Sequence, residues 1–177
     1  SVGNAFTRVY NKNFLEDYKI NKKFFNIVIS HKKYFRYQFN ANYFDVLNSE
    51  LDLLNENVQY RAKNASKIQN LLSDIENITI CTHSSGEVYW RQNILVENGR
   101  NLLLKHLLTK KLKISSWYPT IEPFFFNEKN LKKYPCSNFM SKRILNIWVN
   151  KSADNYYINN VTDQIKIFMD KYELKNK

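Results

Sequence analysis

The sequence has few of the residues on which several common kinds of site depend. It contains only three glycines among 177 residues, Gly3, Gly86 and Gly99. Phosphate-binding loops of the Walker and dinucleotide types need several glycines at fixed spacing. The sequence therefore excludes both kinds of loop from this chain.

Cysteine and histidine are also scarce. The two cysteines, Cys81 and Cys136, form neither a Cys-x-x-Cys pair nor the framework of a disulfide-stapled fold, so we expect reduced thiols. The three histidines, His31, His83 and His106, lack neighbouring ligands at the spacing that a metal site needs. We therefore expect no metal site, and we expect His106 to be a structural residue of a helix.

Long apolar runs are missing as well. No stretch approaches the roughly 18 uninterrupted apolar residues that cross a membrane, and the first residues contain no apolar signal core. These features predict a soluble, cytoplasmic protein without membrane contact.

The residues that are abundant indicate a folded chain with a basic surface. Apolar residues make up 44% of the sequence and aromatic residues 15%, which is too much for a disordered chain. The formal net charge is +11, but the lysines are spread along the sequence as separate pairs. This distribution favours a solvated surface over a nucleic-acid interface.

Hydrophobic periodicity predicts helix first and then strands. From residue 42 to residue 76, apolar side chains recur at steps of three and four residues, which indicates one long amphipathic helix with room for one break. Residues 78–83 and 87–97 are rich in β-branched and aromatic residues and flank Ser84, Ser85 and Gly86. This pattern is typical of a β-hairpin.

The second half of the chain predicts two more helices and a strand. Residues 101–113 have helical spacing, whereas prolines beside aromatic residues predict an irregular loop over 114–135. A short helical turn then leads to a buried strand at 144–149, and a final helix covers 162–174. The residues that could cap this helix are Thr162, Asp163, Asn159 and Asn160.

This order of elements predicts an α+β sandwich. We expect a small, mainly antiparallel sheet with helices on one face, preceded by the long helix. The predicted division is an N-terminal helical segment over residues 1–41 and an α/β domain over residues 42–177.

Several motifs, in order, resemble one known family. RYQFNANYF and LNSELDLLNENVQYR are followed by EVYWRQNILVENGRNLLLKHLL, ISSWYPTIEPFF, YPCSNFMSKRILNIWVN and YYINNVTDQIKIF. Together they resemble the C-terminal region of the DegT/DnrJ/EryC1/StrS aminotransferases over about residues 36–172. In this resemblance Arg61 lies one helical stretch after Leu51, and Arg100 opens the helix after the strand.

The resemblance implies an α+β small domain like that of fold-type I aminotransferases. Members of the family use pyridoxal phosphate (PLP) to aminate keto-sugar nucleotides, and they are usually homodimers. Their cofactor-binding lysine and the aspartate that pairs with the pyridine nitrogen lie upstream of the matching part. No lysine of this chain has a recognisable Schiff-base context, so none is assigned that role. The resemblance therefore implies a portion that is not catalytically complete and uses PLP only with an upstream domain or a partner chain.

The resemblance also implies a set of site residues. Arg36, Tyr37 and Asn40 are expected near the dimer interface, where they face the cofactor phosphate of the partner subunit. Arg36 stands where many family members have asparagine. Trp117 and Tyr118 belong to the tyrosine-proline loop that borders the substrate cleft, so they are expected at the substrate edge.

Two other functions stay open at this point. The chain could be a standalone basic module that binds nucleic acid or a nucleotide, although no aromatic-basic recognition motif supports this. It could also be a structural dimerisation domain, because the helix from Leu47 to Leu72 has an apolar face that can pair with another chain.

Overall fold

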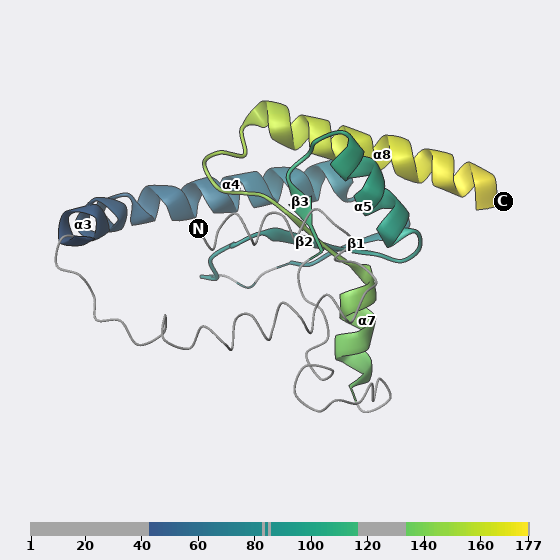
Figure 1. Cartoon of the computed structure of the whole chain (residues 1–177), viewed down its shortest axis with the longest axis horizontal. Coiled ribbons are helices and arrows are strands. Elements are labelled where there is room, and N and C mark those ends of the chain that lie inside the picture. Colours follow the sequence, from purple (N-terminus) through teal and green to yellow (C-terminus); the bar gives the residue numbers. More distant parts are fainter. Residues whose placement is uncertain (1–42, 83, 85, 117–133, 177) are drawn as a thin grey trace. The chain divides into compact units, whose positions relative to one another are not determined.

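The computed structural model describes residues 43–82, 84, 86–116 and 134–176 (Figure 1). The chain divides into two compact units, and nearly all described residues belong to the unit formed by Asp45–Pro119 and Cys136–Lys177. The predicted helical segment over residues 1–41 lies outside the described residues. The elements, in chain order, are α3 (Phe44–Asp52), α4 (Leu54–Leu72), β1 (Ile78–Ile80), β2 (Gln92–Val96), α5 (Arg100–Thr109), β3 (Ile114–Ser115), α7 (Pro135–Arg143), β4 (Ile144–Ile147) and α8 (Asn155–Asn176).

The strands form one antiparallel sheet in the order β1-β2-β4-β3. The predicted hairpin is confirmed by the pairing of Ile78 with Val96 in β1 and β2. In the centre of the sheet Ile94 pairs with Leu145, and at the far edge Ser115 pairs with Asn146.

One face of the sheet carries the hydrophobic core. Strand side chains alternate between faces, and the fully buried residues of β2 and β4 include Ile94, Val96, Leu145 and Ile147. Helix α8 contacts both α4 and α5, and Figure 1 shows these three helices on the same side of the sheet. The helices contribute the buried residues Ile68, Leu72, Leu103, Leu107, Ile158, Ile165 and Met169. The predicted α+β fold with helices on one face of a small antiparallel sheet is therefore confirmed.

The long helix predicted over residues 42–76 is broken once. Leu53 separates α3 from α4 and makes no side-chain capping hydrogen bond. Helix α4 buries Ala65, Ile68 and Leu72 against the core, whereas α3 has no buried residue. The break therefore divides a helix that belongs to the core from a helix whose apolar side chains are exposed.

Several predicted boundaries are wrong. The second strand of the hairpin begins at Gln92 instead of residue 87. Strand β3 lies at the start of the stretch predicted to be irregular, because two residues are too few to produce a periodic signal. Helix α8 begins at Asn155, and its first turn is capped by Asp154, whose Oδ1 accepts a hydrogen bond of 2.7 Å from the backbone N–H of Tyr157. The predicted caps Asn159, Asn160, Thr162 and Asp163 all lie inside this helix.

No helix in the described part of the chain is long and apolar enough to cross a membrane.

Candidate functional site

The five residues predicted for the site lie outside the described residues. These are Arg36, Tyr37, Asn40, Trp117 and Tyr118. The structure does describe the elements that flank them in sequence: α3 begins at Phe44, four residues after Asn40, and β3 ends at Ser115, two residues before Trp117. These elements show where each predicted segment joins the described part of the chain.

The face of the sheet opposite the helices carries a group of polar side chains beside Leu95 and Ile144. The Gln92 side chain lies on the face that the helices cover, because its Oε1 accepts a hydrogen bond of 3.0 Å from Gln69 of α4. Its neighbours Arg91 and Asn93 point to the other face, since side chains alternate along a strand. Asn146 and Ser115 lie beside Asn93 on that face, because cross-strand pairing and side-chain hydrogen bonds join them.

Three of these residues form a row of hydrogen bonds across three strands. The Ser115 hydroxyl donates to Asn146 Oδ1 at 3.1 Å, and Asn146 Nδ2 donates to Asn93 Oδ1 at 2.9 Å. Asn146 is fully buried and Ser115 is 4% exposed, whereas Asn93 is half-buried. Buried amides and hydroxyls are costly unless they are paired, so the row favours one position of β3 at the edge of the sheet. It thereby fixes the chain two residues before Trp117.

An arginine between aromatic rings lies next to this row. The Arg91 guanidinium carbon is 3.7 Å from the centroid of the Trp148 ring and 4.5 Å from that of Trp90. Tyr157 joins the cluster, because its hydroxyl accepts a hydrogen bond from the Trp148 backbone N–H at 3.3 Å and donates to the carbonyl of Lys113. Cation–π contacts of this kind hold the charge of Arg91 in place.

Burial controls the ionisation of Tyr157. It raises the pKa of the Tyr157 hydroxyl to about 12, against the smaller lowering effects of the Trp148 N–H and the Arg91 charge. The Tyr157 hydroxyl is therefore neutral at physiological pH, and it acts as a hydrogen-bonding link between β4 and the residue before β3.

Arg100 holds the C-terminal end of α7, the helix that follows the segment 117–133 in sequence. Its Nε donates to the carbonyl of Lys142 and its Nη2 to the carbonyl of Ser141, both at 2.8 Å. These carbonyls belong to the last turn of α7, where a helix has unpaired acceptors and a partial negative charge. Arg100 is only 8% exposed, so the guanidinium holds the junction of α7 and β4 from within the domain.

Arg61 holds a second junction in a similar way. Its Nη1 donates to the carbonyls of Tyr89 and Trp90, at 3.2 and 3.0 Å, just before β2. The two arginines that marked the family resemblance therefore bind backbone carbonyls of this domain.

The other candidate residues in the described ranges are His106 and the two cysteines. No group of three or more histidine, cysteine or acidic side chains lies close enough there to hold a metal ion. His106 is half-buried in α5, and its Nε2 lies 3.1 Å from Gln164 Oε1 of α8, as expected of a structural residue. Cys81 and Cys136 are free thiols, and burial raises the pKa of Cys81.

The sequence alone did not reveal the polar row. Its signal was an asparagine in each of two mainly aliphatic strands, QNILV and ILNI, where asparagine is disfavoured. The pairing register that brings Asn93 beside Asn146 depends on residues 53 positions apart in the sequence.

A comparison with family models gives one match. The model of the DegT/DnrJ/EryC1/StrS aminotransferase family matches residues 21–166. No curated protein matches the sequence.

Solved structures share the fold at low sequence identity. DesV of S. venezuelae, solved with a ketimine intermediate, is 16% identical and superimposes with a TM-score of 0.63 over 70% of this chain and 35% of DesV. Spr1654 of Streptococcus pneumoniae in its PLP form is 14% identical, with a TM-score of 0.61 over 70% of this chain and 34% of its own. DesI, solved with its TDP-sugar product, is 13% identical, with a TM-score of 0.56 over 67% of this chain and 33% of DesI. The chain thus spans about a third of the length of each of these proteins.

Proposed function

Because the chain belongs to the DegT/DnrJ/EryC1/StrS aminotransferase family, we propose that it forms the C-terminal, small-domain portion of a PLP-dependent aminotransferase that acts on keto-sugar nucleotides. The observation that carries this proposal is the family match over residues 21–166, most of the 177 residues. The sheet with helices on one face supports it, since solved sugar aminotransferases contain the same arrangement.

The proposed portion is not catalytically complete by itself. The part of this chain that matches covers only 35% of DesV and 34% of Spr1654, so most of their fold has no counterpart here. We propose that the large domain comes from further residues of the same polypeptide or from a partner chain.

The described residues do not fit a PLP site of their own. PLP enzymes bind the cofactor through a lysine and place a charged partner at the pyridine nitrogen. None of the lysines in the described ranges is buried. The pocket between α5 and α8 includes Lys105 and Lys171 but no carboxylate among its lining residues. The cofactor is therefore assigned to the large domain, and PLP would supply the transamination chemistry there.

The residues that we propose for the cofactor phosphate are Arg36, Tyr37 and Asn40. A guanidinium can bind a phosphate through two parallel hydrogen bonds, and hydroxyl and amide groups add further donors. These residues immediately precede α3, whose apolar side chains are exposed. That neighbourhood supports a position at an interface, where the three residues would face the phosphate of a partner subunit.

Trp117 and Tyr118 are proposed for the substrate edge. Aromatic rings stack on sugars and nucleotide bases, and β3 and α7 flank the segment 117–133 in sequence. The polar row fixes β3 before the segment, and Arg100 holds α7 after it. Such support from a rigid frame is what precise substrate positioning needs.

The net charge is consistent with this function. A chain of net charge +11 attracts a nucleotide diphosphate through its long-range field. DesI was solved with a TDP-sugar product, which supports a nucleotide sugar as the substrate class. We further propose a cytoplasmic homodimer, or a complex with the partner chain that carries the large domain.

A structural dimerisation domain is the second candidate function. The exposed apolar side chains of α3 favour it, because they could mediate association without any catalytic role. The nucleic-acid alternative is less well supported, since Arg61, Arg91 and Arg100 are all used in contacts within the domain.

The test is an amination assay of the native gene product. The protein is incubated with PLP, an amino-acid donor and a set of nucleoside-diphosphate keto-sugars, and the amino sugar is detected by mass spectrometry. We expect product, and we expect Trp117→Ala to raise KM more than the control substitution Trp90→Ala does. A native product that binds no PLP and forms no amino sugar would leave the dimerisation domain as the better account.

A further inference from the structure

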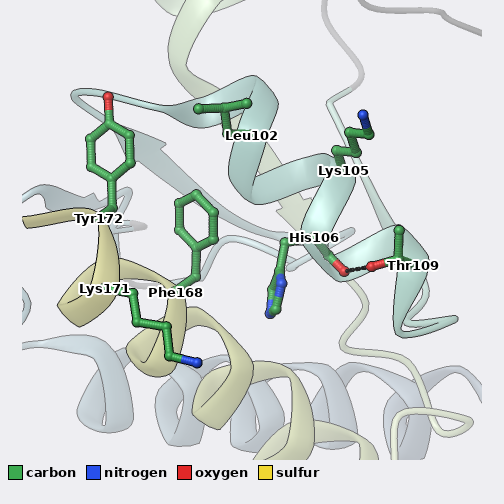
Figure 2. Close-up of a pocket in the computed structure, with 7 residues that line it drawn as sticks. All are labelled: Leu102, Lys105, His106, Thr109, Phe168, Lys171 and Tyr172. Atoms are coloured by element: carbon green, nitrogen blue, oxygen red, sulfur yellow. Dashed lines mark hydrogen bonds between the residues drawn. The ribbon is translucent and has the colours of Figure 1, made fainter. Parts of the chain in front are cut away.

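A pocket lies between α5 and α8, separate from the polar row of the sheet. Its cavity volume is about 540 Å³, and it is lined by Leu102, Lys105, His106, Thr109, Phe168, Lys171 and Tyr172. Figure 2 shows that these side chains come from two helices that face each other across the pocket. The volume is within the range that holds a small organic ligand.

The floor of the pocket is aromatic. The rings of Phe168 and Tyr172 stack with centroids 5.8 Å apart, and His106 lies 5.5 Å from Phe168 in a tilted arrangement. Leu102 adds an aliphatic side chain that is 55% exposed. Such a surface favours the flat face of an aromatic ligand.

The aromatic floor is preformed. Gly99 opens α5 with a positive φ of 76°, and a Cβ at this position would lie 2.9 Å from Cζ of Tyr172. The Tyr172 ring therefore packs directly on the backbone of Gly99, where no other residue would fit without a shift. A floor that is already held in place loses little conformational entropy when a ligand binds.

Among the polar groups that line the pocket, two lysines carry a positive charge that a ligand could contact. The Thr109 hydroxyl donates to the carbonyl of His106, and His106 itself contacts Gln164. Lys105 and Lys171 are exposed and, among the residues that the structure describes, have neither an ion pair nor a hydrogen bond. No carboxylate lines the pocket, so these two ammonium groups determine its charge.

We propose that this pocket binds a small anion with a planar aromatic body. The rings of His106, Phe168 and Tyr172 contact the ligand body, and either Lys105 or Lys171, which Figure 2 shows on opposite sides of the pocket, pairs with its carboxylate, sulfonate or phosphate group. The proposal does not depend on the aminotransferase function, because it rests only on residues of α5 and α8. Failure of either proposal therefore leaves the other unaffected.

The test uses a fluorescent probe of this chemistry. The chain is titrated with anilinonaphthalene sulfonate, and in parallel with phenylnaphthylamine, which has the same rings without the sulfonate. We expect the sulfonate to bind more tightly, and we expect Leu102→Asp to abolish its binding. Circular dichroism checks that each variant stays folded.

Two double variants of equal net charge locate the site. Lys105→Gln with Lys171→Gln removes the proposed partners, whereas Lys110→Gln with Lys166→Gln removes lysines of the same helix region that do not line the pocket. The first pair should weaken sulfonate binding about two- to fivefold, as expected for one exposed ion pair. The proposal is overturned by equal affinities in the two double variants, by equal binding of the neutral analogue, by unchanged binding to Leu102→Asp, or by no binding at all.

Discussion

Arginine side chains hold several backbone junctions of this domain together. Arg100 binds two carbonyls at the end of α7, and Arg61 binds two carbonyls before β2. The family resemblance pointed to both arginines, but their partners lie 28 to 42 residues away in sequence. Contacts at such separations depend on the pairing of strands and helices, so the sequence pattern alone could not predict them.

The substitution Arg100→Lys should destabilise the domain by about 1–3 kcal/mol. A lysine has one compact ammonium group and cannot reproduce the two hydrogen bonds that the guanidinium makes to adjacent carbonyls in a buried site. Urea unfolding measures this change. Arg61→Lys is the matched control, and a smaller effect is expected because Arg61 is more exposed. Equal costs for both substitutions would contradict the role assigned to Arg100.

The hydroxyl of Tyr157 should make stability depend on pH in alkaline solution. Its pKa is raised from 10.0 to about 12, so the unfolded chain loses this proton at a lower pH than the folded domain does. The stabilisation is complete below the ordinary pKa and is lost as pH rises through the folded one, with a slope of at most about 1.4 kcal/mol per pH unit. Unfolding followed at several pH values between about 9 and 12 measures this slope.

Tyr157→Phe isolates that contribution. The variant should be less stable by about 1–3 kcal/mol at neutral pH, because the Trp148 N–H and the Lys113 carbonyl lose their partner, and its alkaline slope should be smaller. Tyr156→Phe is the control, since Tyr156 is 77% exposed. A variant with the same alkaline slope as the original chain would show that another group is responsible.

At the scale of elements, periodicity predicted the longer helices and strands and failed for the shortest ones. The spacing of apolar residues identified α4, α5, β2 and the later part of α8, because each buries one face in the core. Strand β3 has two residues and no periodicity of its own, so only its pairing with β4 defines it. The five predicted site residues lie outside the described ranges and stay predictions.

The start of α8 was placed too late because three of its first six residues are asparagines, which are typical of caps and turns. The structure assigns the cap to Asp154 instead. We predict that Asp154→Ala destabilises the domain by about 1 kcal/mol, the usual cost of losing an N-cap. Asp163→Ala, inside the same helix and exposed, should have a much smaller effect in thermal unfolding. A larger effect at Asp163 would favour Asp163, predicted from the sequence, as the helix cap instead of Asp154.

At the scale of the whole molecule, the apolar side chains around α3 need a covering surface. The residues from 43 to 54 include seven large apolar side chains that are at least 41% exposed: Tyr43, Phe44, Val46, Leu47, Leu51, Leu53 and Leu54. We call this set the α3 surface. An apolar concentration of this kind is typical of a surface that binds another protein chain.

We predict that the chain self-associates through the α3 surface. Sedimentation velocity should show a concentration-dependent dimer, and the double substitution Leu47→Glu with Leu51→Glu should shift the equilibrium to monomer. Val88→Glu is the control, because Val88 is 57% exposed and lies outside the α3 surface. A dimer that persists in the double variant would mean that another surface joins the two copies.

We propose that this chain supplies the small domain of an enzyme whose cofactor lysine lies elsewhere. The most direct measurement is borohydride reduction of the native gene product with PLP, followed by mass-spectrometric mapping of the pyridoxyl group. Reduction fixes the cofactor covalently to the lysine that holds it. We predict a single pyridoxyl-lysine in residues beyond this sequence or in a partner chain, and none among residues 1–177. A pyridoxyl group on a lysine of this chain would contradict the claim.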